Sequence, residues 1–357
     1  MVANDMPELN GYFAVHSQGL GHATRAVALA RGLRQQRPDL YFLFVAGVPA
    51  IDLIIASGFD AMPLPPVPDW PARDGAFGPI WRWYVDYGRY LRVARRFLGA
   101  EVDWARTRFL LSDGEAASIG TAIRHGTPTA AIVHGLRRDF ARDVPSRLAE
   151  GCYNFWFSRL ARKIELILSL GPAPAWPNVR RIGPIARPFS APRERLREEF
   201  VFRKRTILVT AGGTAIGEFL VRRAIRAFRE QRIADASMFV VSGPRLKVSP
   251  EPGVYTYGFV PNLQDYILAA DLVITTAGTS TVAETLAAGT PIIAIPPRGH
   301  AEAERNAREL GFVHDDIRRL HDLIPERLAS GRMPPRATEN ERAVRLLLDF
   351  LEGKVGA

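Results

Sequence analysis

Short apolar runs alternate with helical patterns along the whole chain. In the first half, the expected strands are 11–16, 41–46, 60–64, 108–112 and 129–134, and the expected helices are 22–36, 49–57, 83–98, 115–125 and about 144–162. In the second half, the expected strands are 206–210, 237–242, 254–257, 271–275 and 291–295, with a helix at 216–230 after the first of them. This alternation predicts parallel sheets with helices on both faces, in which ligands bind at the carboxyl ends of the strands.

A proline-rich segment, 171–192, interrupts the alternation and holds only a short strand around Val179–Ile182. We therefore expect an α/β protein of two doubly wound, Rossmann-like domains that face each other across a cleft. The first domain is placed at 1–187 and the second at 188–338. The pattern from Glu339 to Leu351 predicts a helix that returns to the first domain, within a C-terminal segment 339–357.

The composition is that of a globular protein without a membrane-spanning segment. The chain of 357 residues is 47% apolar and 24% charged, which suits a globular protein with two cores. We see no run that would span a bilayer and no signal-peptide pattern, and the single cysteine, Cys152, excludes a cysteine-based metal cluster. We expect a cytoplasmic protein, in free solution or peripheral at the inner face of the membrane.

The net charge of +10 favours anionic partners, such as phosphorylated ligands or anionic lipid. No nucleic-acid partner is expected, because no recognised module is present and the arginines are scattered. Aromatic and basic residues mix at 77–96, where two interpretations stay open: a face for lipid headgroups, or a partly buried helix with a solvated arginine face.

The segment from His16 to Arg25 carries the first candidate chemistry. Gly19 and Gly21 lie where a strand turns into a helix, so the backbone can bend sharply and approach a ligand. His22 would stand at the helix N-terminus, where unpaired N–H groups favour anions. The alternative is a helix-capping turn with an incidental histidine.

Further titratable groups are expected at the same sheet edge. Asp113 and Glu115 follow one strand and His134 ends the next. A carboxylate or imidazole there would deprotonate a hydroxyl. For Asp113 the alternative is a simple helix cap.

The second cluster lies between 270 and 310. The small, hydroxyl-rich turn 276–281 leads into a helix that carries Glu284. Exposed N–H groups and the helix dipole would cradle a phosphate. A carboxylate one turn further on would bind the two hydroxyls of a ribose.

These motifs resemble the donor domain of GT-B glycosyltransferases, with family 28 closest, the family that includes the lipid-linked GlcNAc transferase of peptidoglycan synthesis. The matching segments are Gly212-Gly213, Gly258–Pro261, Ala270-Asp271, Gly278–Glu284, Pro291–Pro296 and Asn306-Ala307. The turn from Gly19 to Arg25 resembles the Gly-x-Gly-His-x-x-Arg turn of related glycosyltransferases.

The resemblance implies a role for each matching residue. Phe259 and Val260 would lie against the base, Glu284 would hold the ribose, and Glu302 would reach the donor sugar. The diphosphate would be held by Gly278, Thr279, Ser280 and Thr281, with Gly213, Thr214 and Arg187 beside it. Ala303 stands where many relatives carry glutamine, so the sugar end differs from theirs.

The sequence thus predicts an enzyme that moves a hexose from a UDP-sugar to a lipid-linked or glycan acceptor. His22, Asp113 and Glu115 are the candidates for the chemistry. No cofactor and no metal are expected, because the turn and helix dipole would stabilise the departing diphosphate. Two alternatives stay open: a nucleotide-sugar hydrolase of the same fold, and a non-catalytic nucleotide-sugar binder.

Overall fold

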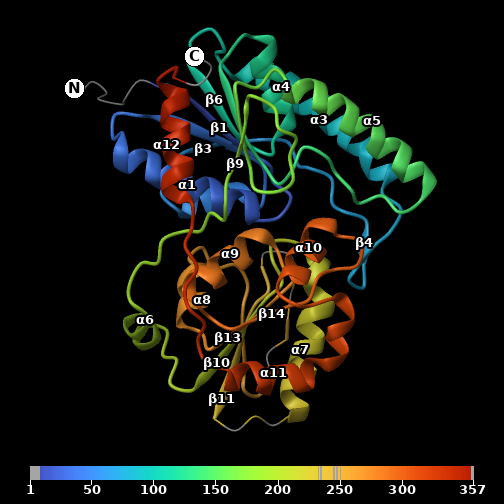
Figure 1. Ribbon diagram of the computed structural model, residues 1–357, viewed down its shortest axis with the longest axis vertical. Coiled ribbons are helices and arrows are strands. Elements are labelled where there is room, and N and C mark those ends of the chain that lie inside the picture. The colour runs from blue at the N-terminus through green and yellow to red at the C-terminus, as the bar shows by residue number, and fades with distance from the viewer. Residues whose placement is uncertain are drawn as a thin grey trace.

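The computed structural model describes residues 9–354, apart from 232, 234, 244, 245, 247 and 250. Two α/β domains are stacked along the long axis of the molecule (Figure 1). The first domain contains a seven-stranded parallel sheet with the order β3-β2-β1-β6-β7-β8-β9. Its strands are β1 (Gly11–Val15), β2 (Phe42–Ala46), β3 (Ala61–Pro63), β6 (Phe109–Asp113), β7 (Thr129–Val133), β8 (Leu166–Ser169) and β9 (Val179–Arg181).

Helices cover both faces of this sheet because each face is apolar. One face packs against α1 (Gly21–Gln36) and α2 (Ala50–Ala56). The other packs against α3 (Trp81–Glu101), α4 (Ala116–Arg124) and α5 (Val144–Ala161). A short hairpin of β4 (Ala72–Arg73) and β5 (Ala76–Phe77) extends toward the second domain.

The second domain repeats the design around a five-stranded parallel sheet with the order β12-β11-β10-β13-β14. Its strands are β10 (Arg205–Thr210), β11 (Ala236–Val241), β12 (Val254–Tyr257), β13 (Leu272–Thr275) and β14 (Ile292–Ala294). Its helices are α6 (Arg193–Glu199), α7 (Glu218–Gln231), α8 (Leu263–Ala269), α9 (Thr279–Ala288), α10 (Ala301–Glu309) and α11 (Leu320–Ala329), with 3-10 turns at Ala215–Gly217 and His314–Arg319.

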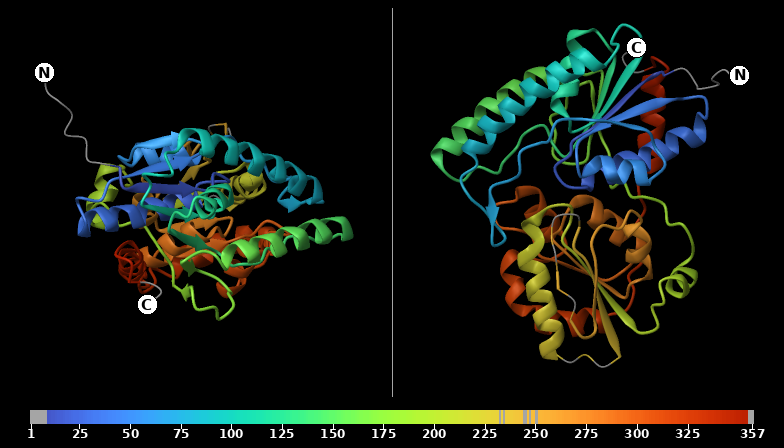
Figure 2. Two further views of the ribbon diagram at one scale, coloured as in Figure 1. Left: turned by 90° about the horizontal axis from the view of Figure 1, so that it is seen from above. Right: turned by 180° about the vertical axis from the view of Figure 1, so that it is seen from behind.

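The last helix, α12 (Asn340–Leu351), crosses back to the first domain and packs on α1 (Figure 2). Val344 and Leu347 are buried in the same core as Leu29 and Leu33. Gly32 permits the close approach, since a Cβ there would lie 2.6 Å from the Val344 side chain. The chain therefore connects the two domains twice.

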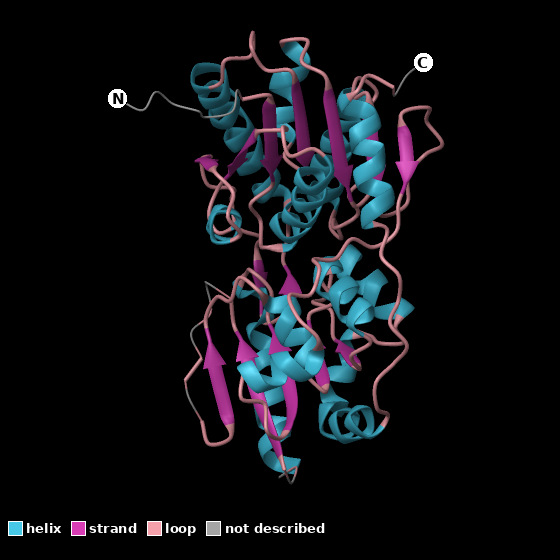
Figure 3. Ribbon diagram, turned by 90° about the vertical axis from the view of Figure 1, so that its left-hand side faces the viewer, coloured by secondary structure: helices cyan, strands magenta, loops and turns pink. Residues whose placement is uncertain are grey.

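The strands of both sheets point toward the junction between the domains (Figure 3). The loops at their carboxyl ends therefore meet there, where ligands bind in sheets of this kind. Several elements lie outside the sequence expectation, among them the β4–β5 hairpin, α6 and α11. β8 is another, a short and mostly apolar run that follows α5 without a glycine or proline turn to mark it.

Candidate functional site

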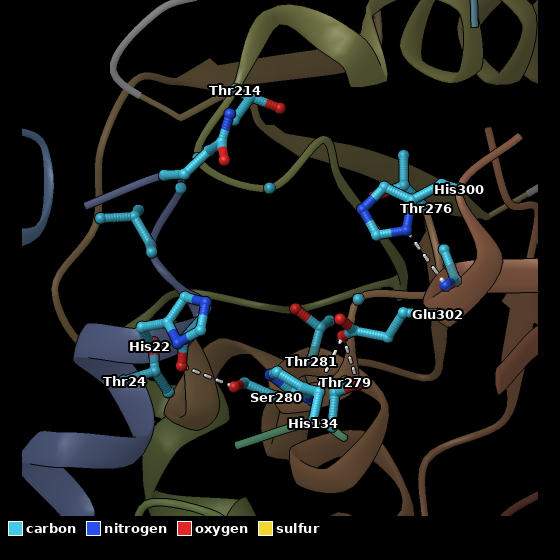
Figure 4. Close-up of a pocket in the computed structure, with 18 of the residues that line it drawn as sticks. His22, Thr24, His134, Thr214, Thr276, Thr279, Ser280, Thr281, His300 and Glu302 are labelled. Atoms are coloured by element: carbon cyan, nitrogen blue, oxygen red, sulfur yellow. Dashed lines mark hydrogen bonds and ion pairs between the residues drawn. The ribbon is translucent and has the colours of Figure 1, made fainter. Parts of the chain in front are cut away.

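A cleft of about 370 Å³ lies between the domains and is lined by the glycine-rich loops of both (Figure 4). Every residue for which the sequence predicts substrate binding lines it: Gly19, Gly21, Arg187, Gly213, Thr214, Phe259, Val260, Gly278, Thr279, Ser280, Thr281, Glu284 and Glu302. His22 and His134 line it from the first domain.

His22 is held by a buried carboxylate. Its Nδ1 lies 2.7 Å from Oδ1 of Asp113, whose side chain has no solvent exposure. Asp113 also accepts from Arg25, with Nε at 2.7 Å from Oδ2. Burial by itself raises the pKa of Asp113, but the Arg25 guanidinium and the hydrogen bond from His22 outweigh it and hold that pKa below its usual value. Asp113 is therefore an anion that fixes the Nδ1 proton of His22 and leaves Nε2 to accept one.

The strand order creates this pair. β1 and β6 are neighbours, with Val15 opposite Asp113 in the register, so the turn after β1 lies directly over the end of β6. Gly114 keeps the space open: its φ is +70°, and a Cβ there would lie 2.8 Å from the His22 ring.

His134 links the first domain to the second. Its Nε2 lies 2.9 Å from Nη1 of Arg25, and its Nδ1 lies 3.5 Å from Oε1 of Glu302. Burial lowers the pKa of His134 to about 3, so the ring is neutral at physiological pH. A neutral ring that accepts from Arg25 at Nε2 carries its proton on Nδ1, toward Glu302.

The second domain presents the N-terminus of α9 to the cleft. Gly278 is the N-cap, and no side chain caps the helix. The first N–H groups therefore remain open to an anion. Ser280 donates from Oγ to the Gly21 carbonyl of the first domain at 2.8 Å (Figure 4).

Glu302, from the start of α10, accepts a 2.6 Å hydrogen bond from Thr279 Oγ1. Burial by itself raises the pKa of Glu302, but the neighbouring histidines and the Thr279 hydroxyl lower it to about 2. Glu302 is thus a carboxylate able to accept from sugar hydroxyls.

Glu284 and Arg187 form a buried bidentate pair. The Nε–Oε1 distance is 2.7 Å and the Nη2–Oε2 distance is 3.2 Å, and the side chains are 4% and 1% exposed for Arg187 and Glu284. Arg187 also donates to the Pro261 carbonyl, beside Phe259 and Val260. Both Glu284 oxygens are therefore paired with Arg187, close to Phe259 and Val260, the residues predicted to lie against the base.

Glu115 does not take part in the site, and its prediction as a catalytic group is wrong. Its fully buried carboxylate caps α4, accepting from Ala117 N and Ser118 N, and also accepts from Ser118 Oγ at 2.6 Å and from Tyr90 Oη at 2.9 Å. No lone pair is left to face an acceptor. Asp113 is also buried, so its role is corrected: it positions His22 and does not itself contact an acceptor.

The aromatic and basic segment at 77–96 is mostly a packed helix. Trp83 is 3% exposed and stacks between Trp70 and Tyr87, with ring centroids 4.2 Å and 4.8 Å away. Trp81 is 38% exposed. The segment is therefore a partly buried helix that leaves some of its side chains exposed.

Sequence reasoning missed the aromatic wall of the cleft in the first domain. Trp70, Phe140 and Tyr153 line it together with Arg138. These residues come from three separate loops and helices and share no motif, so no local signal marks them.

The described residues offer neither a metal site nor a membrane span. No group of three or more His, Cys, Asp or Glu side chains among them is arranged to hold a metal ion. No helix within the described ranges is long and apolar enough to cross a bilayer.

Residues 206–331 match the family model described as the glycosyltransferase family 28 C-terminal domain. The chain is 25% identical over 322 residues to an uncharacterized glycosyltransferase of Methanosarcina acetivorans, covering 82% of this chain and 79% of that one. It is 26% identical over 349 residues to the UDP-N-acetylglucosamine–N-acetylmuramyl-(pentapeptide) pyrophosphoryl-undecaprenol N-acetylglucosamine transferase of a Nocardioides species, covering 90% and 88%.

Solved structures show the same fold. A spinosyn rhamnosyltransferase matches with a TM-score of 0.60 at 15% identity, covering 97% of this chain and 96% of that one. A glycosyltransferase from Streptomyces nogalater matches with a TM-score of 0.59 at 18% identity, covering 95% and 100%. The fold is therefore GT-B, as the sequence predicts.

Proposed function

We propose that this chain is a family 28 glycosyltransferase of the GT-B fold and that it transfers a hexose from a UDP-sugar to a hydroxyl group held by its first domain. One observation carries the proposal. A histidine positioned by a buried carboxylate faces, across one cleft, the uncapped N-terminus of a helix. The first arrangement suits a general base and the second suits a departing diphosphate.

In the proposed reaction, His22 Nε2 takes the proton of the acceptor hydroxyl as its oxygen attacks the anomeric carbon. The bond from that carbon to the diphosphate oxygen breaks, and UDP leaves. The N–H groups of Gly278–Thr281 stabilise the negative charge on the leaving group, so no metal is invoked. Asp113 stabilises the imidazolium that forms.

The same cleft supports the proposed donor. Glu302, held by Thr279, is placed to accept from hydroxyls of the sugar. Glu284 and Arg187 lie near the proposed ribose and base end. The Nocardioides relative is named for a UDP-sugar, whereas some structural neighbours were solved with thymidine diphosphate, so both nucleotides belong in the test.

The deciding experiment measures binding and turnover on the same protein. A ligand that binds only the folded state raises the melting temperature, and at equal concentration the tighter ligand raises it more. UDP should therefore raise the melting temperature more than thymidine diphosphate does. A panel of UDP-sugars is then incubated with and without acceptors, and free sugar and glycosylated product are separated. Rapid stoichiometric release of free sugar without acceptor would identify the hydrolase, and binding without turnover would identify the non-catalytic binder.

We also propose peripheral contact with anionic membrane through α3 and α5. These neighbouring helices expose apolar side chains, among them Trp81, Val93, Leu148 and Phe155. Binding to anionic vesicles should fall as salt rises, and Phe155→Asp should weaken it while Ile55→Asp, at an exposed site on α2, should not. No binding at low salt would place the acceptor in solution.

A further inference from the structure

Arg138 is a partly buried cation without a carboxylate partner in the described part of the chain. Its guanidinium lies over the rings of Trp83, Tyr87 and Tyr153, at 5.1, 5.1 and 4.1 Å from their centroids. Its Nη1 is inaccessible to solvent and has no hydrogen-bond partner. Cation–π contact holds the charge in place without neutralising it. An unsatisfied buried donor of this kind is costly unless a ligand supplies an acceptor.

The backbone around Arg138 is fixed. Its N–H donates to Asn154 Oδ1 at 2.9 Å, and its carbonyl accepts from Asn154 Nδ2 at 3.0 Å. Asn154 belongs to α5, so a side chain of that helix sets the position of the loop. The guanidinium is thus preorganised at the wall of the cleft, to which Arg138 contributes.

A second unpartnered group lies at the same end of the cleft. His16 lines the cleft, and its buried Nδ1 has no hydrogen-bond partner. Burial, together with the charges of His22 and Arg138, holds the pKa of His16 well below its usual value. The neutral ring offers one hydrogen bond without adding charge.

The walls beside Arg138 are aromatic. Trp70 lies 5.1 Å from Phe140, ring centroid to ring centroid. Phe140 also lies 5.4 Å from the His300 ring of the second domain, so this wall reaches across the cleft. Tyr153 completes it on the side of α5. Ring faces and edges select planar partners through stacked and edge-on contacts, which a flexible alkyl chain does not reproduce.

We propose that the acceptor is a planar, acidic molecule whose carboxylate or other anionic group pairs with Arg138 while its ring lies among Trp70, Phe140 and Tyr153. This inference rests on the proposed function, since it names the acceptor class of the same cleft. The anionic group would meet Arg138 at the wall, and the hydroxyl to be glycosylated would lie toward His22.

The test is binding measured without any donor. The probes are 4-hydroxybenzoate, its neutral methyl ester, and dodecyl phosphate, which carries an acidic group on a flexible chain. Ligand-detected NMR gives their affinities for the wild type, Arg138→Met, Arg138→Lys and the control Arg147→Met, which removes an exposed arginine of α5. UDP affinity is measured on every sample as a check on folding and on the donor site.

The acid should bind the wild type and Arg147→Met at least about tenfold more tightly than it binds Arg138→Met, as expected for a hydrogen bond to a charged group. The ester should bind weakly and show no dependence on Arg138. Equal binding of acid and ester to the wild type would overturn the proposal, as would Arg138-dependent binding of dodecyl phosphate in preference to 4-hydroxybenzoate.

If Arg138→Met does not fold, the affinities of the acid and the ester for the wild type and for Arg138→Lys still test the proposal. Failure of the proposed function looks different. In that case the acid binds through Arg138 while no UDP-sugar is turned over.

Discussion

The pair of His22 and Asp113 permits a quantitative prediction. His22→Ala removes the proposed general base, which costs about 10²- to 10⁴-fold in turnover. The buried Arg25–Asp113 pair stays intact in this variant, so stability should fall only by the roughly 1.5–3 kcal/mol of a hydrogen bond to a charged group. UDP affinity, which rests on the second domain, should change little.

Asp113→Asn acts on the same unit in another way. An amide nitrogen placed toward His22 donates rather than accepts, so the ring proton moves to Nε2, the atom needed as base. A loss of up to about 10⁴-fold in turnover is expected from that change of tautomer. Arg25, 1% exposed, would also lose its counter-charge, which costs about 3–5 kcal/mol of stability.

The assay is a double-mutant cycle. Turnover at saturating donor concentration is measured for each single variant and for the double variant. The free energy of unfolding is measured on the same proteins by urea denaturation. Because both residues act through one proton, the double variant should be no slower than the slower single variant. Additive losses in turnover, or near-wild-type turnover of His22→Ala, would refute the reasoning. His125→Ala, at an exposed histidine, is the matched control.

Three further outcomes are expected. Glu284→Ala should lower stability by about 3–5 kcal/mol, because it leaves Arg187 buried and unpaired, and the double variant with Arg187→Met should regain most of that loss in urea unfolding. The pKa of His134 is about 3 in the folded state, so below about pH 6.5 the unfolded chain takes up a proton that the folded protein does not. The free energy of unfolding should therefore fall as pH drops from 7 to 5, with a slope that approaches about 1.4 kcal/mol per pH unit for this group. His134→Gln should remove that contribution from the plot of unfolding free energy against pH. Gly213→Ala would place a Cβ 2.6 Å from the backbone of the first glycine loop, so it should open the cleft and cut turnover about 10²-fold. The control Gly151→Ala, at a position with open space around it, should have no effect on turnover. Unchanged turnover of Gly213→Ala would show that the two loops separate freely.

Local signals in the sequence predict many of the strands and helices of this molecule and several of the turns that line its cleft. Apolar runs separated by helical periods predict both sheets, and the glycine-rich turns predict which strand ends carry the chemistry. The turn around His22 and the turn at 278–281 both lie at the cleft because they contain the residues that a strand-to-helix turn with a ligand needs. Even the returning helix α12 is visible from its apolar spacing.

The role of each side chain is less visible from the sequence, because it depends on what packs around it. Glu115 and Asp113 are two residues apart and chemically alike. One caps α4 in the core and the other positions His22. Trp83 and Trp81 differ in the same way, since one faces the core beneath α3 and the other faces solvent.

The sequence by itself determined two α/β domains, a linker and two small-residue turns at strand ends, because these depend on residues close together in the chain. Only the tertiary structure decided the partners of those turns. Asp113 meets His22 from 91 positions away because β6 lies beside β1, and Ser280 meets Gly21 across 259 positions because the two sheets point at each other. Arg138 and its aromatic wall are likewise assembled from separate segments, so their chemistry exists only once strand order and domain packing have brought those segments together.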